Sequence, residues 1–343
     1  MNAQTLIDTA RHMIGSGKGL LAMDESTGTC NKRFAEQGIP QTEEMRRAYR
    51  DMIVTTPGIG DALGGAILFD ETIRQKTLAG VHFAEALNRA GVIPGIKVDE
   101  GAKDLPFHPG EKVTEGLDGL RERLKEYGSL GARFAKWRAV ITPGEGIPTK
   151  ACIKANAHAL ARYAALCQEA DIVPIVEPEV LMDGNHTLER CREITEQTLH
   201  IVFNELYAAG VLLEGMVLKP NMVLPGLDCP VQDGVEAVAE ATLNTFRRTV
   251  PAAVAGIAFL SGGQSAELAS ARLNAMNIIA HTPGSRVPWP VAFSYSRAIQ
   301  QPALEAWKGK AENVKAAQKI LKHRMECNKA AMAGKYTAAM EQA

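Results

Sequence analysis

The feature that most constrains this chain is a short apolar run, rich in strand-forming residues, that recurs eight times between longer amphipathic stretches. The runs are GLLAMDES (19–26), GAILFDE (65–71), IPGIKVDE (93–100), RFAKWRAV (133–140), IVPIVEPEV (172–180), GMVLKPN (215–221), GIAFLSGG (256–263) and PVAFSYSR (290–297). Strands that alternate with helices pair in parallel through right-handed crossovers. Eight such units predict an α/β fold, a closed (β/α)8 TIM barrel.

The segments between the runs have the periodicity of helices that bury one face. Apolar residues recur at three- and four-residue spacing in 151–170, 187–210 and 235–250, which predicts amphipathic helices. We also expect an N-terminal helix at about 3–14 and a long C-terminal helix at about 301–332.

No domain boundary is visible in the sequence. No internal repeat, low-complexity tract or Pro/Ser-rich linker interrupts the chain, so we expect one domain over 1–343 with a short flexible tail at 337–343. An open doubly wound sheet is the alternative fold, but it normally has a glycine-rich phosphate turn after its first strand. That turn is missing, and GSGKG (15–19) lacks two features of a P-loop.

Charge and residue spacing exclude several classes of protein. The 38 basic and 39 acidic residues leave a net charge of −1, which gives no field to recruit nucleic acid or a membrane surface. No apolar run approaches the roughly 18 residues of a membrane span, and the start does not resemble a signal peptide. The scattered cysteines and histidines form no CxxC, HxxH or HExxH pattern. We therefore expect reduced thiols, a cytoplasmic location and no metal site.

Ionisable residues gather near the C-terminal ends of seven of the eight runs. They are Asp24, Glu25, Asp70, Glu71, Lys97, Asp99, Lys136, Arg138, Glu177, Glu179, Lys219 and Arg297. Strand C-termini converge on one mouth of a barrel, where the active site is built. Ion pairs at the barrel rim remain an alternative reading for Glu25, Asp70, Glu71 and Asp99.

Three of these residues carry the chemical argument. Lys136, Glu177 and Lys219 would share one lumen, where burial and neighbouring charges shift pKa values strongly. A lysine tuned in this way attacks carbonyl groups and forms a Schiff base. The simpler alternative for Lys219 is that the strand ends there and the amine reaches solvent, since Pro220 follows.

A phosphate site is predicted after the seventh and eighth runs. SGGQSAEL (261–268) has two glycines that let backbone N–H groups approach an anion, followed by the start of a helix. Arg297, at the end of the eighth run, would add a guanidinium group. The loops after strands seven and eight are a recurrent phosphate site in (β/α)8 barrels.

Seven motifs together resemble one known family. LLAMDESTGT, GIKVD, FAKWR, VPIVEPE, LKPNM, FLSGGQS and FSYSRA stand in the order of class I fructose-bisphosphate aldolases, and the resemblance runs from about residue 4 to Tyr336. It implies a metal-independent (β/α)8 lyase without a cofactor, commonly a homotetramer. Such a lyase cleaves fructose 1,6-bisphosphate to dihydroxyacetone phosphate and glyceraldehyde 3-phosphate in glycolysis, and catalyses the reverse reaction in gluconeogenesis.

The resemblance also implies roles for single residues. Lys219 matches the Schiff-base lysine, Glu177 the general acid/base for dehydration, and Asp24 the acid that takes or orients the C4-hydroxyl proton. Glu179 is expected to support the lysine charges, and Lys136 to stabilise developing charge and depress the pKa of Lys219. The candidates for one phosphate site are Ser261, Gly262, Gly263, Ser294, Ser296 and Arg297. The candidates for the other end of the substrate are Ser26, Thr29, Arg33, Lys97 and Arg138.

Three departures from the family pattern stand out. Ser296 replaces a usual glycine, which alters phosphate binding in a direction that the sequence does not fix, and Thr29 replaces a common serine. The chain ends in GKYTAAMEQA, whereas the animal enzymes continue to a terminal tyrosine that assists proton transfer. We expect that proton transfer to proceed here without a tail tyrosine.

Three alternative functions remain open from the sequence. One is another Schiff-base sugar-phosphate lyase or transaldolase, and a second is a zinc-dependent aldolase, which the histidine spacing disfavours. The third is a barrel that has lost catalysis and serves as a binding protein. That reading predicts a disrupted lysine and carboxylate set, whereas every expected member is present.

Overall fold

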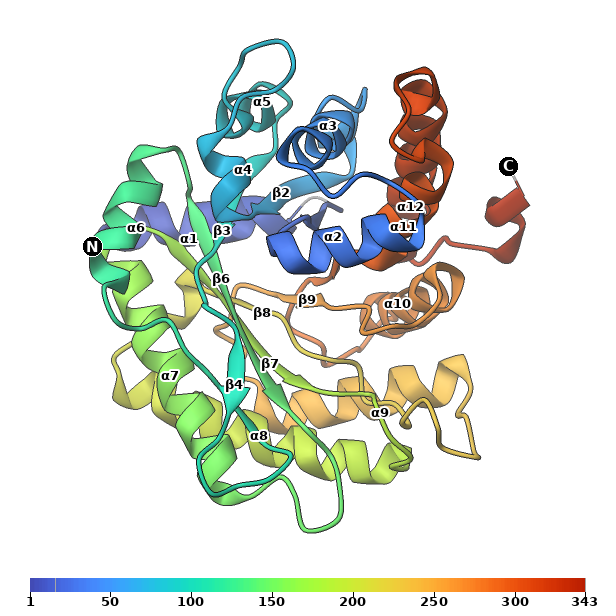
Figure 1. Cartoon of the computed structure of the whole chain (residues 1–343). Coiled ribbons are helices and arrows are strands. Elements are labelled where there is room, and N and C mark those ends of the chain that lie inside the picture. The colour runs from blue at the N-terminus through green and yellow to red at the C-terminus, as the bar shows by residue number, and fades with distance from the viewer. Residues whose placement is uncertain (16, 343) are drawn as a thin grey trace.

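The predicted closed barrel is confirmed by a computed structural model, which describes residues 1–15 and 17–342. Eight parallel strands close in the order β1-β10-β9-β8-β7-β6-β3-β2 (Figure 1). They are β1 (Gly19–Ala22), β2 (Leu63–Leu68), β3 (Ile93–Lys97), β6 (Phe134–Ile141), β7 (Val173–Val180), β8 (Val217–Leu218), β9 (Ile257–Phe259) and β10 (Val291–Tyr295). Each strand overlaps one of the predicted runs. The open doubly wound sheet is therefore excluded.

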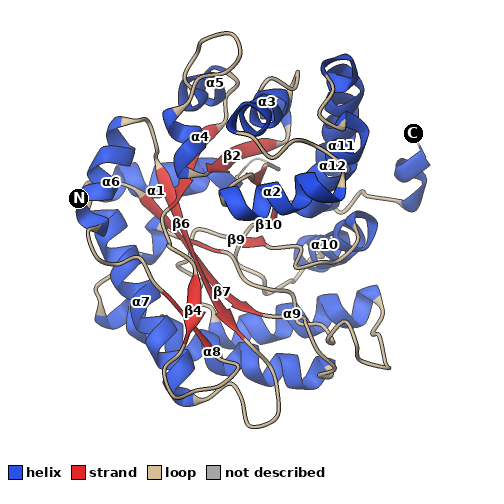
Figure 2. Cartoon of the chain, in the orientation of Figure 1, coloured by secondary structure: helices blue, strands red, loops and turns tan. Residues whose placement is uncertain are grey.

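Helices surround the strands as an outer layer (Figure 2). They are α1 (Ala3–Ile14), α2 (Thr27–Glu36), α3 (Glu43–Val54), α4 (Asp70–Arg74), α5 (Phe83–Arg89), α6 (Leu120–Ser129), α7 (Lys150–Glu169), α8 (Leu188–Ala208), α9 (Val235–Thr249), α10 (Ala266–His281), α11 (Arg297–Trp307) and α12 (Val314–Met332). Short 3-10 turns are η1 (Ile59–Asp61), η2 (Leu213–Gly215), η3 (Ala311–Asn313) and η4 (Ala338–Gln342). Hydroxyl side chains start several helices. Thr149, Thr187 and Ser265 cap α7, α8 and α10 by accepting hydrogen bonds from first-turn backbone N–H groups.

The lumen is filled by side chains that need small neighbours. A Cβ atom on Gly95 would lie 2.2 Å from the Phe134 ring, and one on Gly19 would lie 2.5 Å from the Phe293 ring. These glycines let two buried aromatic rings occupy the barrel interior, as expected for the packed core of a (β/α)8 barrel. The polar C-terminal end of the barrel therefore lies next to a tightly packed apolar interior.

A large hydrophobic core contains residues from Leu6 to Tyr336, and a smaller cluster around Ile141, Val180 and Val223 lies beside it in the described residues. This continuity supports our proposal that the chain forms a single domain. Among the described residues, no helix combines the length and the apolarity that crossing a membrane requires. Of the expected tail, residues 338–342 form the turn η4, while residue 343 lies outside the described residues, as does residue 16 of the GSGKG loop.

The prediction of one long helix at 301–332 was wrong. α11 begins earlier, at Arg297, and ends at Trp307, because Lys308 and Gly309 take left-handed backbone conformations with φ of 50° and 73°. A glycine just beyond the last helical residue commonly ends a helix. The helix end at Gly309 was not predicted because amphipathic segments lie on both sides of it. The sequence also gave no sign of the antiparallel hairpin of β4 (Ala102–Asp104) and β5 (Lys112–Thr114).

Candidate active site

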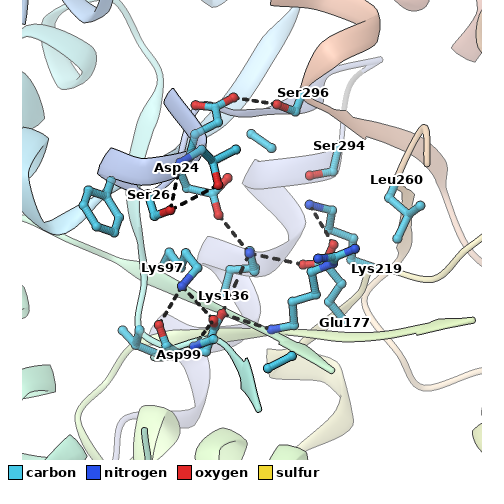
Figure 3. Close-up of a pocket in the computed structure, with 18 of the residues that line it drawn as sticks. Asp24, Ser26, Lys97, Asp99, Lys136, Glu177, Lys219, Leu260, Ser294 and Ser296 are labelled. Carbon is cyan, nitrogen blue, oxygen red and sulfur yellow. Dashed lines mark hydrogen bonds and ion pairs between the residues drawn. The ribbon is translucent and has the colours of Figure 1, made fainter. Parts of the chain in front are cut away.

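A cavity of about 1210 Å³ opens at the C-terminal ends of the strands, and all but one of the sixteen predicted site residues line it. Figure 3 shows the lysines and carboxylates projecting into it from different strands. The exception is Gly263, which lies behind the lining. A Cβ atom there would be 3.3 Å from Nη2 of Arg297. The structure therefore brings fifteen of the sixteen predicted residues together around one cavity, while their roles stay predictions.

Lys219 is buried at the end of β8. Its side chain is 5% exposed, and its Nζ lies 3.2 Å from Oε1 of Glu177. The backbone N–H of Lys219 still donates to Val176 O in the neighbouring strand at 2.8 Å, which fixes the residue to the barrel wall. The alternative in which this amine reaches bulk solvent is therefore wrong. The amine faces a carboxylate inside the mouth instead.

Lys136, from β6, is surrounded by acids. Its Nζ lies 2.8 Å from Asp24 Oδ2, 3.5 Å from Glu177 Oε2 and 3.9 Å from Asp99 Oδ2. Burial alone would lower the pKa of Lys136, but the three carboxylates outweigh it and raise the pKa above its ordinary value. Lys136 therefore carries a permanent positive charge. The Glu177 carboxylate lies between this amine and the amine of Lys219.

Asp24 is held ionised by the same cluster. Burial would raise its pKa, but the charges of Lys136 and Lys219 and the hydrogen bond from Lys136 outweigh burial and lower the pKa to about 2. The residue follows β1, so the mouth brings together groups from β1, β6, β7 and β8 (Figure 3). At neutral pH, Asp24 can accept a hydrogen bond or a proton from a bound hydroxyl group.

Replacing Asp24 by asparagine should therefore have a pH-dependent cost in stability. The folded pKa of about 2 lies below the ordinary 3.8. The carboxylate thus contributes stability that is fully present well above 3.8 and is lost as the pH falls towards 2. We expect Asp24→Asn to unfold about 2 kcal/mol more easily at neutral pH, with about half of that difference gone by about pH 3. Urea unfolding of both proteins across this range measures it. A difference that does not depend on pH would contradict the pairing.

Two other mouth charges are paired in ways that the sequence did not predict. Glu179 was expected to support the lysines, but it accepts a hydrogen bond from Nε of Arg138. Lys97 Nζ donates to the backbone oxygen of Asp99 at 2.6 Å and forms an ion pair with its Oδ1 at 2.6 Å. Asp99 lies inside the cavity and is buried, so the rim alternative is wrong for it.

Two acids at the start of α4 form the ion pairs and hydrogen bonds that the rim alternative expects. Asp70 accepts hydrogen bonds from Arg74 and Tyr127, and Glu71 pairs with Arg46 at 2.6 Å. These acids belong to α4, the helix that follows β2, and they fix that helix to its neighbours. Both acids therefore have structural partners, although Asp70 also lines the cavity. The buried carboxylates of the cavity are Asp24, Glu25, Asp99, Glu177 and Glu179.

Glu25 is the centre of a buried network on one side of the cavity. Its Oε1 accepts hydrogen bonds from Arg33 at 2.6 Å and from the Ser296 hydroxyl at 2.7 Å, while Arg50 Nη1 lies 2.7 Å from Oε2. Burial would raise the pKa of Glu25, but Arg50 and Arg33 outweigh it and lower the pKa. Arg50 was not among the predicted residues, because α3 carries no sequence motif that indicates a position near the cavity.

Ser296 does not take the left-handed backbone conformation that would call for glycine. Its φ is −109°, a value open to any residue, and its hydroxyl is engaged by Glu25. Arg33 Nη1 also lies 3.4 Å from this hydroxyl. The serine therefore joins the end of β10 to α2 through Arg33, which a glycine could not do.

The loop after β9 has the geometry of an anion cradle. Gly262 and Gly263 have φ of +54° and +91°, the left-handed region that favours glycine. Successive N–H groups in such turns form concave anion sites, and α10 starts three residues later. Arg297 lies beside Gly263. The Ser294 hydroxyl, on the cavity wall, is buried without a hydrogen-bond partner among the described residues.

Polar and basic side chains also gather at the start of α2. Ser26 caps this helix by accepting a hydrogen bond from the Thr29 backbone N–H, and the two hydroxyl oxygens are 3.1 Å apart. Arg33 lies one turn further along the same helix. Lys97 and Arg138 line the cavity as well, so positive groups flank the central lysines on two sides.

Taken together, this geometry defines an enzyme class: a (β/α)8 barrel that acts with buried amines and carboxylates on a substrate with anionic ends. A family model for fructose-bisphosphate aldolase class-I matches residues 5–343. The chain belongs to the class-I fructose-bisphosphate aldolase family and is therefore a lyase with a role in glycolysis.

Similar proteins extend over nearly the whole chain. A probable fructose-bisphosphate aldolase class 1 of Xanthomonas axonopodis pv. citri is 55% identical and covers 98% of this chain and 99% of its own length. The fructose-bisphosphate aldolase of Dictyostelium discoideum is 48% identical, covering 98% and 93%. A co-crystal structure of the Plasmodium falciparum aldolase with TRAP and an inhibitor superposes with a TM-score of 0.95 at 48% identity, covering 98% and 96%.

Proposed function

We propose that this chain cleaves fructose 1,6-bisphosphate reversibly to dihydroxyacetone phosphate and glyceraldehyde 3-phosphate through a Schiff base on Lys219. The observation that carries the proposal is the buried Lys219 amine, 3.2 Å from a Glu177 carboxylate that also lies 3.5 Å from Lys136. A nucleophile, a proton carrier and a fixed charge thus stand in one cluster. The same reaction in reverse serves gluconeogenesis.

The first half of the reaction uses Lys219 and Glu177. The neutral amine attacks the C2 ketone of the substrate and forms a carbinolamine. Glu177 then gives a proton to the departing hydroxyl group, which leaves as water, and the C2 carbon becomes an iminium. The positive charge of Lys136 stabilises oxygen anions that develop beside it.

The second half breaks the carbon–carbon bond. Asp24 takes or orients the proton of the C4 hydroxyl group, the C3–C4 bond breaks, and its electron pair moves to the iminium to form an enamine. The C4 carbon leaves as the aldehyde of glyceraldehyde 3-phosphate. Protonation of the enamine at C3 and hydrolysis then release dihydroxyacetone phosphate and free Lys219.

Two groups of residues hold the phosphates. The cradle after β9 binds one of them through backbone N–H groups, the α10 N-terminus and Arg297, and the unpartnered Ser294 hydroxyl faces the same part of the cavity. Ser26, Thr29, Lys97 and Arg138 bind the other end, and the Ser296 hydroxyl steadies Arg33 there. These local positive groups suit an anionic substrate although the chain as a whole is nearly neutral.

We also propose a homotetramer in the cytoplasm. The homotetramer follows from the family, whose members commonly form homotetramers. A relative from Arabidopsis thaliana that is 51% identical is named a cytosolic aldolase. Light scattering of the purified protein would measure the mass of the assembly directly.

Borohydride trapping tests the proposed reaction. Borohydride added together with dihydroxyacetone phosphate or fructose 1,6-bisphosphate should inactivate the enzyme and leave a covalent adduct on the peptide that contains Lys219. A Schiff base is reduced to a stable amine, so the adduct survives digestion and mass spectrometry locates it. Borohydride alone is the control. An adduct on another lysine, or inactivation that does not need substrate, would contradict the proposal.

Two further measurements separate the alternatives. EDTA should leave the cleavage rate unchanged, whereas a zinc-dependent aldolase would lose activity. Cleavage should be faster with fructose 1,6-bisphosphate than with fructose 1-phosphate, because the mouth offers cationic or helix-terminal groups to both substrate ends. Equal rates would favour another sugar-phosphate lyase, and no cleavage of either would favour the binding protein.

A further inference from the structure

A second cluster of reactive side chains lies outside the mouth. His323 and Cys327 are four residues apart on α12, which places them on one face of the helix, and η4 brings Glu341 against them. None of the three lines the active-site cavity. Figure 1 shows the C-terminal segment at the periphery of the molecule, beyond the outer helices. The reaction proposed above does not use this cluster.

The three ligand atoms have the spacing of a metal site. His323 Nε2 lies 3.6 Å from Cys327 Sγ and 4.0 Å from Glu341 Oε2, and all three atoms are within 4.8 Å of one another. Tetrahedral zinc bonds of about 2.0–2.3 Å to nitrogen, oxygen and sulfur put ligand atoms roughly 3.4–3.6 Å apart. The histidine–cysteine distance already fits, whereas the carboxylate oxygen of Glu341 has to move closer to both ligand atoms.

The carboxylate of Glu341 is oriented by two further groups. The Tyr336 hydroxyl donates to Oε1 at 2.7 Å, and the buried Arg324 donates to Oε2. A carboxylate offers about four lone-pair positions, so Oε2 can bind a cation and keep its bond to Arg324. Arg324 also donates to Ser270 at 3.0 Å, which holds it in place. Hydrogen bonds of this kind orient metal ligands in known sites.

We propose that His323, Cys327 and Glu341 bind zinc and that the ion fastens η4 to α12. One thiolate, one imidazole and one carboxylate form a ligand set that zinc accepts, and water would complete the tetrahedron. The ion enters from the side of His323, whose side chain is 27% exposed, because Cys327 is buried. The positive charge of Arg324 weakens the site compared with sites made only of neutral and anionic groups.

The competing explanation is a simple hydrogen-bonded contact without any metal. Titration of the full-length protein with cobalt, after treatment with a chelator, distinguishes the two. Cobalt should give a thiolate charge-transfer band and the intense visible bands of tetrahedral cobalt, and zinc should displace both. Binding should release about one proton for each ion, because the thiol must become a thiolate. Absence of the charge-transfer band would overturn the proposal.

Matched variants locate the site. Cys327→Ser and His323→Gln should each weaken cobalt binding by more than about 100-fold, beyond the range typical of outer-shell changes. Cys229→Ser and His281→Gln are the controls, since these residues lie outside the cluster, and they should bind as the unchanged protein does. Binding that survives in Cys327→Ser would show an adventitious site elsewhere and would overturn the proposal.

Proteolysis tests whether zinc holds η4 against α12. Zinc should slow the release of C-terminal residues by carboxypeptidase in the unchanged protein by at least about tenfold, and it should have no effect in Cys327→Ser. Unchanged cleavage of fructose 1,6-bisphosphate by the variant would show that it is folded. If carboxypeptidase releases C-terminal residues from the unchanged protein at the same rate with and without zinc, the ion does not fasten η4 to α12. These outcomes do not depend on whether Lys219 forms a Schiff base.

Discussion

Replacing Lys219 by methionine is expected to lower kcat for fructose 1,6-bisphosphate by at least about 10⁴-fold and to abolish borohydride trapping. Removal of a covalent nucleophile costs up to about 10⁶-fold in well-studied enzymes. Methionine has nearly the length of lysine and no charge, so it fills the same space at the end of β8. Steady-state cleavage and mass spectrometry of the trapped protein measure the two effects.

The fold should survive this replacement. Glu177 loses the amine at 3.2 Å but keeps Lys136 at 3.5 Å, so its buried charge is not left without a partner. Lys97→Met is the matched control. It also removes a lysine from the mouth, but that lysine is paired with Asp99, and trapping should persist in this variant. Trapping of Lys219→Met at the original stoichiometry would show that another amine forms the adduct.

The barrel could be predicted from the sequence because its strands are buried on both faces and read as apolar runs. Lys136, Glu177 and Lys219 could be grouped because the ends of parallel strands meet at one mouth, whatever their distance along the chain. For the barrel and its mouth, the local sequence pattern and the topology of the fold therefore predict the same arrangement of residues. The family resemblance then supplied a substrate and individual roles that spacing does not define.

The network around Glu25 could not be predicted, for a physical reason. Its hydrogen bond to Ser296 joins residues 271 positions apart, and Arg50 reaches it from α3. Such contacts depend on how helices pack against the barrel, which periodicity does not encode. The pairing of Glu179 with Arg138 depends in the same way on the register of β6 and β7.

The proposed zinc site shows a different limit of prediction from sequence. The sequence has no HxxH or HExxH pattern, and a histidine four residues before a cysteine, as at His323 and Cys327, is not one of these patterns. The third ligand, Glu341, comes from a turn that the sequence placed in a flexible tail. Only the docking of η4 brings it within 4.0 Å of His323.

Glu177→Gln is expected to lower kcat by about 10²- to 10⁴-fold, the usual contribution of a general acid or base. Glutamine keeps the shape of the side chain but cannot give a proton to the departing hydroxyl group. Lys219 also loses its carboxylate partner, so the variant should unfold about 3 kcal/mol more easily. Cleavage assays and urea unfolding measure these two losses separately.

The rate of trapping shows which step Glu177 serves. Because dehydration of the carbinolamine comes before the Schiff base, Glu177→Gln should slow the approach to full trapping in parallel with kcat, while the final yield of adduct stays the same. Glu179→Gln is the control on the same strand face, since Glu179 pairs with Arg138, and it should trap at nearly the original rate. Asp24→Asn should also trap at nearly the original rate yet fail to cleave, because Asp24 acts after the Schiff base. If Glu177→Gln traps as fast as the unchanged enzyme, dehydration does not depend on Glu177, and another of the mouth acids must supply that proton.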